Sequence, residues 1–155
     1  MGGFMRAKIL VPCAVALILA VGHPASAQHS NAASSVRLPD FAGRDKQFAY
    51  LRTRILAAMK EGANFAGHYT ILTIGCGTGC TYNLILDRKT GAVGELPYGG
   101  EQQQQLKLRY GLKSNLLGAT WFDGDLCVEQ QAKWNGMAFE ISNSPSGRPE
   151  EVCRG

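Results

Sequence analysis

The glycine-rich stretch ILTIGCGTGC, at residues 71–80, holds the first residues whose types and spacing could do chemistry. An apolar strand that runs into Gly-Cys-Gly-Thr-Gly is typical of methyltransferases that use S-adenosylmethionine, because glycines let the backbone approach a ligand closely. The parallel sheet of such an enzyme needs a helix after the loop, whereas residues 81–87, TYNLILD, alternate as a strand does. Thr73 stands where a carboxylate usually ends the first strand, although Glu95 lies near the distance expected for a ribose-binding acid. We therefore interpret the stretch as structural and expect no cofactor.

Cys76 and Cys80 could form a redox pair or supply two ligands to a soft metal ion. A metal site needs further ligands, and His68 is the only histidine in the part of the sequence that we expect to fold, since His23 and His29 precede it. If the intervening strand is extended, His68 lies about 25 Å from Cys76. We expect a structural disulfide and no metal site. Thiol chemistry at these two cysteines is the alternative.

Groups for acid-base or nucleophilic catalysis are sparse. His68 would have to be the base of any Ser-His-Asp or Cys-His arrangement, and nothing local identifies a nucleophile beside it. We favour a buried, hydrogen-bonded structural histidine. Asp123 and Asp125 flank Gly124 in an expected turn, but a calcium site takes about six or more oxygen ligands. We therefore predict no catalytic residue and lean against an enzyme.

The N-terminus has the pattern of an export signal. Arg6 and Lys8 precede an apolar run at residues 9–21, which is too short to span a bilayer and ends in Ala25-Ser26-Ala27. We predict a signal peptide at residues 1–27, with an uncleaved membrane anchor as the alternative. Removing these 27 of the 155 residues leaves 128, enough for one domain. We expect a flexible, polar lead-in at residues 28–40 and a single domain at residues 41–155.

The charge balance excludes one class of partner. The predicted signal peptide carries Arg6 and Lys8 and no acid, so its removal lowers the net charge from +4 to +2. The remaining Lys and Arg residues are scattered, without the basic stripe that nucleic-acid binding requires. We expect no nucleic-acid partner and no stable membrane insertion after cleavage.

Four cysteines remain after the predicted cleavage, and an even number in an exported protein indicates disulfides. Three pairings are possible. We favour Cys76 with Cys80, because they would face each other across the mouth of a hairpin. We pair Cys127 with Cys153, because Cys153 lies in a polar tail, SNSPSGRPEEVCRG, that has no other reason to be ordered.

The elements that would position these residues follow from periodicity. Phe48, Leu51, Ile55 and Met59 recur at helical spacing before Gly62, which predicts an amphipathic helix at residues 45–61. HYTILTIG and TYNLILD alternate, and the glycines between them predict a tight hairpin.

Further strands are expected at residues 92–96, 106–110, 116–122, 128–134 and 137–141, and a second hairpin turns at Asn135-Gly136. Strands so close in sequence pair antiparallel. The predicted fold class is α+β, mainly β: one N-terminal helix packed on an antiparallel meander sheet of about six or seven strands, stapled by disulfides.

The segments NFAGHYTILTIGCGTGC, LDRKTGAV, SNLL and KWNGMAFEI resemble an uncharacterised family of small exported proteins of Gram-negative bacteria, marked by an NFAGHY…GCGxxC motif. The resemblance covers about residues 62–141, and the part from NFAGHY to Cys80 is specific. It implies an exported origin. It transfers no catalytic residue and no ligand to this protein.

We predict a periplasmic or secreted, non-enzymatic binding protein of the inhibitor or immunity type, whose partner is another exported protein. Its candidate binding residues lie near the NFAGHY segment and the CGTGC turn, and they are Asn64, Phe65, His68, Tyr69 and Thr78. The alternative is a periplasmic factor that uses Cys76 and Cys80 for thiol redox chemistry or soft-metal binding.

Overall fold

The computed structural model describes residues 35–154, so the predicted signal peptide and the first part of the predicted lead-in lie outside the described residues. The described part begins with a 3₁₀ helix, η1 (Lys46–Leu51), that continues into α1 (Arg52–Glu61). Eight strands and a short second helix follow: β1 (Tyr69–Gly77), β2 (Cys80–Asp87), β3 (Val93–Glu95), β4 (Gln104–Arg109), β5 (Leu116–Asp123), β6 (Leu126–Trp134), β7 (Phe139–Ile141), β8 (Ser146–Arg148) and α2 (Glu150–Arg154). No helix within residues 35–154 is long and apolar enough to cross a membrane.

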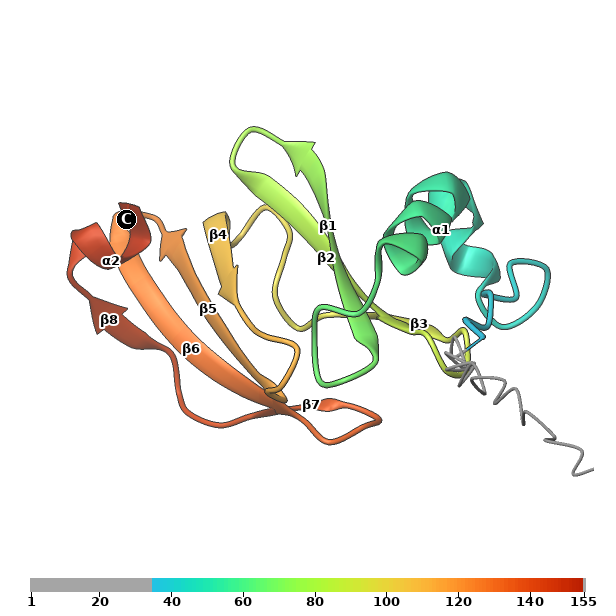
Figure 1. Ribbon diagram of the computed structural model, residues 1–155. Coiled ribbons are helices and arrows are strands. Elements are labelled where there is room, and N and C mark those ends of the chain that lie inside the picture. The colour runs from blue at the N-terminus through green and yellow to red at the C-terminus, as the bar shows by residue number, and fades with distance from the viewer. Residues whose placement is uncertain (1–34, 155) are drawn as a thin grey trace, which may run out of the picture. The chain divides into compact units, whose positions relative to one another are not determined.

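The predicted helix is present, with its first half wound more tightly than expected. Phe48 on η1 and Ile55 and Met59 on α1 are buried, as the helical spacing predicts. They pack against Ile74 of β1 and against Leu84 and Leu86 of β2. The helix therefore covers one face of the β1–β2 hairpin (Figure 1).

The strands form two antiparallel sheets, which corrects the prediction of a single meander of six or seven strands. One sheet has the order β1-β2-β3, and the other has the order β4-β5-β6-β7 with β8 paired to β6. The break falls between β3 and β4, where Leu96 and Tyr98 turn into the core instead of extending the ladder. A string of short strands does not reveal this break, because turns within a sheet and turns between sheets use the same residues.

The β1-β2-β3 sheet lies between the helix and the second sheet, because its two faces belong to two different cores. Leu84 and Leu86 face the helix. Ile71 and Ile85 join the core shared with the second sheet, to which Leu117, Ala119, Trp121, Val128 and Ala132 contribute. β2 is the central strand of this sheet, and burial on both of its faces explains why Leu84, Ile85 and Leu86 are apolar in succession.

Both predicted disulfides are present. Cys76 and Cys80 lie 5.2 Å apart between Cα atoms at the tip of the β1–β2 hairpin, which reverses at Thr78-Gly79. Gly79 has φ +71°, a conformation that suits glycine, and the register slips at this tip, so the turn is one residue tighter than predicted. Cys127 and Cys153 lie 5.8 Å apart and join β6 to α2. One disulfide therefore closes the hairpin and the other holds the C-terminal tail, as predicted.

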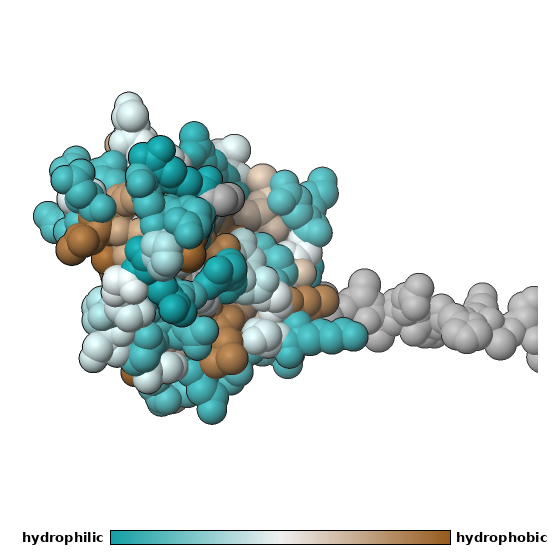
Figure 2. All heavy atoms as spheres, turned by 90° about the vertical axis from the view of Figure 1, so that its left-hand side faces the viewer, coloured by the Kyte–Doolittle hydropathy of each residue, from teal (hydrophilic) through white to brown (hydrophobic). Residues whose placement is uncertain are grey.

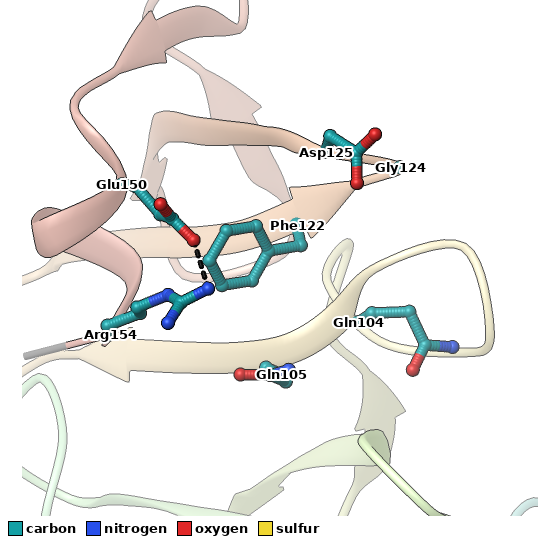
Figure 3. A pocket seen from close by; sticks show the side chains of 7 residues that line it. All are labelled: Gln104, Gln105, Phe122, Gly124, Asp125, Glu150 and Arg154. Carbon is teal, nitrogen blue, oxygen red and sulfur yellow. Dashed lines mark ion pairs between the residues drawn. The ribbon is translucent and has the colours of Figure 1, made fainter.

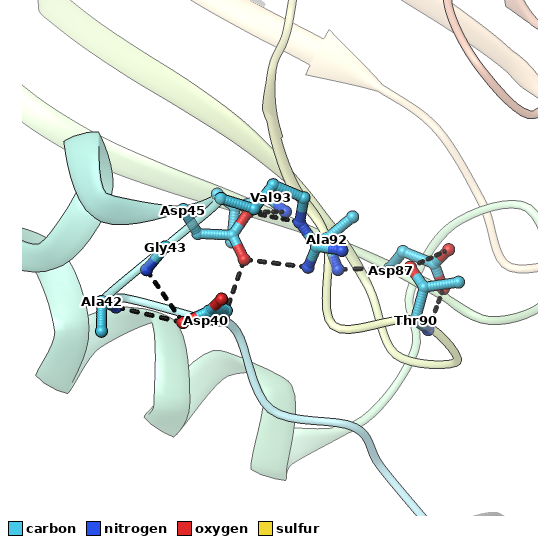
Figure 4. Close-up of polar contacts among 9 residues, drawn as sticks. Asp40, Ala42, Gly43, Asp45, Asp87, Thr90, Ala92 and Val93 are labelled. Carbon is cyan, nitrogen blue, oxygen red and sulfur yellow. Dashed lines mark hydrogen bonds and ion pairs between the residues drawn. The ribbon is translucent and has the colours of Figure 1, made fainter.

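A buried carboxylate ties the N-terminal turn to the sheet. Asp45 is 1% exposed; its oxygens accept hydrogen bonds from the backbone N–H of Asp40 at 2.9 Å and of Val93 at 3.2 Å, and the Arg44 guanidinium pairs with it (Figure 4). Residues 35–40, part of the predicted lead-in, run beside the β2–β3 turn, and the Arg37 N–H donates to the Arg88 carbonyl oxygen. This segment is thus held by hydrogen bonds.

Candidate functional site

Four loops meet at one end of the two sheets: residues 62–68, 88–92, 110–115 and 135–138. Backbone hydrogen bonds join them in pairs, from Gly67 to Leu112, from Arg88 to His68 and from Trp134 to Asn115. We call these four loops the loop end. The CGTGC turn lies at the other end of β1, about 30 Å away for nine extended residues. The two regions near which binding residues were predicted therefore lie at opposite ends of β1.

Three of the predicted binding residues shape the loop end from inside. The Asn64 side chain donates to the carbonyl oxygen of Ile71 and accepts from its N–H, at 3.0 and 2.7 Å, and so holds the loop onto β1. Phe65 is fully buried, with its ring edge-on to Tyr110. Tyr69 is buried as well. Their side chains leave little surface for a partner.

His68 and Thr78 are the predicted binding residues that reach solvent. Thr78 is exposed at the hairpin tip. We expected a buried His68, but its side chain is 28% exposed, because it sits in a loop at the start of β1. Its ring stacks on Tyr69 at 4.1 Å, and its Nε2 lies 3.4 Å from Oδ1 of Asp87. Burial and the charge of Lys89 lower the pKa of His68, against the opposite effect of Asp87.

Asp87 is engaged by its own turn and does not activate His68. Its Oδ1 accepts the N–H groups of Lys89 and Thr90, and its Oδ2 accepts the Thr90 hydroxyl at 2.7 Å (Figure 4). Burial raises its pKa, but these hydrogen bonds and His68 outweigh that effect and the pKa falls. An aspartate held this way caps a turn, and within residues 35–154 no hydroxyl or thiol group is hydrogen-bonded to the His68 side chain.

A cationic pocket of about 640 Å³, which we call the Arg88 pocket, opens beside His68. It is lined by Ser35, Val36, Ala63, Gly67, His68, Arg88 and Lys89. The Nε of Arg88 is buried and has no hydrogen-bond partner among the described residues. The Arg88 side chain thus lines this space, and its closed-off Nε–H lacks an acceptor among the described residues.

A second pocket of the loop end, the Trp134 pocket, holds about 390 Å³ and is mainly apolar. Its walls are Tyr69, Ile85, Asp87, Thr90, Ala92, Val93, Gly94, Trp134, Gly136 and Met137. The Trp134 indole N–H is buried and unpartnered within residues 35–154. Met137, at the tip of the Asn135-Gly136 hairpin, is 91% exposed. An apolar lining with one free donor is typical of a site for a side chain or small ligand.

A larger pocket of about 760 Å³ lies at the other end of the second sheet, and its lining side chains include Gln104, Phe122, Asp125, Glu150 and Arg154. Figure 3 shows the Glu150–Arg154 ion pair beside the Phe122 ring, so the two charged residues of α2 that line this pocket satisfy each other. None of the buried polar atoms that lack partners in the described part of the protein belongs to this pocket. It makes a weaker case for a ligand than the loop end.

The described surface offers no other obvious chemistry. Among residues 35–154, no group of three or more His, Cys, Asp and Glu side chains could hold a metal ion. Seen from the side of β8 and α2, the surface is mostly hydrophilic and its apolar patches are separate (Figure 2). Single apolar residues on a surface are normal and need no partner.

Arg88 was not predicted, since an arginine in a turn gives no signal of its own. Trp134 ends the strand predicted at residues 128–134, and its ring packs on Tyr69 at 5.4 Å. The turn signal Asn135-Gly136 follows it directly and places it next to an exposed loop, and this could have indicated a pocket. No protein-family model, no curated protein and no solved structure matches this sequence.

Proposed function

We propose that this protein is an exported, non-enzymatic binding protein that holds another exported protein at the loop end. The observation that carries the proposal is the pair of buried, unpartnered donors at this end, the Arg88 Nε and the Trp134 indole N–H. A buried donor without an acceptor is rare in a folded protein, because it loses about 1–3 kcal/mol relative to a satisfied one. Because both atoms are closed off from solvent, a partner recovers this loss when the loops shift as it binds and it brings acceptors to them.

The exposed apolar side chains favour a macromolecular partner. Met137 projects from the rim of the Trp134 pocket, and the loop end also exposes Leu112. Methionine adapts its shape to a binding surface, and apolar contacts around a partly buried tryptophan are typical of protein interfaces. Catalysis is less well supported, because Asp87 is committed to its turn and, within residues 35–154, no hydroxyl or thiol group is hydrogen-bonded to the His68 side chain.

Export is supported by the predicted signal peptide, by the family resemblance and by two disulfides in a small domain. Disulfides persist in oxidising compartments such as the periplasm. A periplasmic or secreted location follows from these observations as part of the proposal.

One observation favours the second candidate function, a thiol redox factor. Cys76 is exposed at a hairpin tip, whereas Cys127 and Cys153 are buried. An accessible disulfide is more readily reduced than a buried one. However, Cys76 does not lie at a helix N-terminus, the usual device for activating a thiolate, since it belongs to β1.

Affinity capture tests the proposal. Residues 28–155 are immobilised and exposed to periplasmic extract from the producing cells, beside two matched variants, Met137→Asp at the loop end and Leu126→Asp at the opposite end of β6. Both side chains are highly exposed, so neither variant should unfold the domain. We expect the wild type and the Leu126→Asp variant to retain one protein, and the Met137→Asp variant not to retain it. Retention of nothing above background, or loss with Leu126→Asp alone, would refute the proposal.

A further inference from the structure

The Arg88 guanidinium is the least satisfied charged group at the loop end. Arginine carries five N–H donors and stays protonated, so it normally pairs with a carboxylate, a phosphate or carbonyl groups. Arg88 is half-buried, its Nε is buried without an acceptor, and no ion pair among residues 35–154 includes it. Its Nη1 approaches Gly62, so the guanidinium lies along the wall of the pocket.

The charges around Arg88 do not neutralise it. Lys89 and His68 line the same pocket, and both can only add positive charge. Asp87, the acid that precedes Arg88 in the sequence, is not part of this lining, and both of its oxygens accept hydrogen bonds within the turn. The pocket therefore has an excess of positive charge in a partly buried place, where an anion is favoured more strongly than on an open surface.

The residues before the described part of the protein cannot supply the missing anion. Residues 1–34 contain no Asp and no Glu, although Ser35 and Val36 show that this end of the polypeptide passes close to the pocket. Residues 1–34 therefore offer no carboxylate side chain to Arg88, and no ion pair of residues 35–154 supplies one.

We propose that the Arg88 pocket binds a carboxylate of the partner protein, which pairs with the Arg88 guanidinium. This inference rests on the proposed function and deepens it, because it names the chemistry that the partner must present. A carboxylate matches the two-pronged geometry of guanidinium, whereas Lys89 supplies only a point charge. An acidic side chain of the partner and the partner's own C-terminus carry the same group, and the experiment separates them.

The test is a nitrogen-15 NMR titration of residues 28–155, observing the Arg88 Nε–H resonance. Four probes are used: acetyl-Leu-Asp-Leu-amide, its Asn counterpart, acetyl-Leu-Ala-Leu with a free carboxylate, and inorganic phosphate. We expect the Asp peptide or the free-carboxylate peptide to shift this resonance saturably at millimolar concentration, and the Asn peptide to leave it unchanged. Whichever of the two carboxylate peptides binds more tightly identifies the source. No saturable shift, equal binding of the Asn peptide, or a response to phosphate alone would overturn the proposal.

Two variants complete the test. Arg88→Gln should weaken binding of the preferred carboxylate peptide by about tenfold or more, because a charge-assisted pair is lost. Arg54→Gln removes an exposed arginine of α1 and should leave binding within about twofold. If captured protein is lost with Met137→Asp yet fully retained by Arg88→Gln, the carboxylate site is wrong while the proposed function stands. If the carboxylate peptide binds but affinity capture retains no protein, the carboxylate site stands while the proposed function is wrong.

Discussion

Replacing Asp45 with Asn keeps the size of the side chain and should loosen the N-terminal turn from the sheet. The carboxylate holds three groups from three parts of the protein: the N–H of Asp40, the N–H of Val93 on β3, and the Arg44 side chain. Asparagine keeps one acceptor oxygen, but its NH₂ group would point a donor at another donor. One backbone N–H is therefore left unsatisfied at a site that is 1% exposed.

The size of the effect comes from the two backbone hydrogen bonds. The Arg44 side chain is half exposed, so its ion pair with Asp45 adds little. A hydrogen bond to a buried charged group contributes about 1.5–3 kcal/mol, and an orphaned buried donor loses a similar amount. We expect Asp45→Asn to lower the free energy of unfolding by about 3 kcal/mol. For a domain of this size the melting temperature should fall by about 10 °C.

The effect should depend on pH in a defined direction. Burial raises the pKa of Asp45, but hydrogen bonds from Arg44, Val93 and Asp40 outweigh it, so the pKa lies below its ordinary value of 3.8. A carboxyl whose pKa is lowered by folding stabilises the protein above the unfolded pKa and loses this contribution as the pH falls through the folded pKa. The gap between wild type and Asp45→Asn should be full at neutral pH and shrink below about pH 4.

Urea unfolding followed by tryptophan fluorescence measures this at several pH values. Asp123→Asn is the matched control, because Asp123 is exposed and makes no side-chain contact that we find within residues 35–154; it should change stability by less than about 0.5 kcal/mol. If Asp45→Asn unfolds at the same urea concentration as the control at pH 7, or if its deficit persists unchanged in acid, then the turn is not held by this carboxylate.

Two further predictions concern the disulfides and one glycine. A mild reductant with an alkylating agent should label the Cys76–Cys80 pair, where Cys76 is exposed, well before the buried Cys127–Cys153 pair. Mass spectrometry measures the two labelling rates, and equal rates would contradict the assigned burial. Gly91→Ala should destabilise by about 2 kcal/mol in urea, because φ is +76° and a Cβ would lie 2.4 Å from the Leu38 carbonyl oxygen. Gly100→Ala has positive φ and open space, so it should lose only about 1 kcal/mol, and an equal loss at both sites would contradict the steric contact.

The local elements could be predicted because their signals are local. The buried stripe of Phe48, Ile55 and Met59 required only helical spacing, and the CGTGC hairpin required only alternation with glycines between two strands. The Cys127–Cys153 pairing was also correct, because four cysteines leave few choices once one pair is local.

The division into two sheets could not be predicted in this way. It depends on Leu96 and Tyr98 filling the space between the sheets, a choice set by what lies across the core and not by neighbours in sequence. β8 was missed for a related reason: its residues, Ser146–Arg148, are all exposed and show no alternation, and only the disulfide and β6 hold them. The Arg88 pocket was equally invisible, since its lining comes from three separated segments.

The NFAGHY segment, residues 64–69, joins the two sheets at the loop end. Asn64 fixes it to β1 of the first sheet, while Phe65 packs on Tyr110 and Phe139 beside the second. The segment therefore sets how the loops from the two sheets meet, and those loops carry Arg88 and Met137. Under the proposed function, the packed residues of the motif hold the loops in place, and the exposed residues of those loops contact the partner. Truncating Phe65 would disturb both pockets together, whereas Arg88→Gln affects only one.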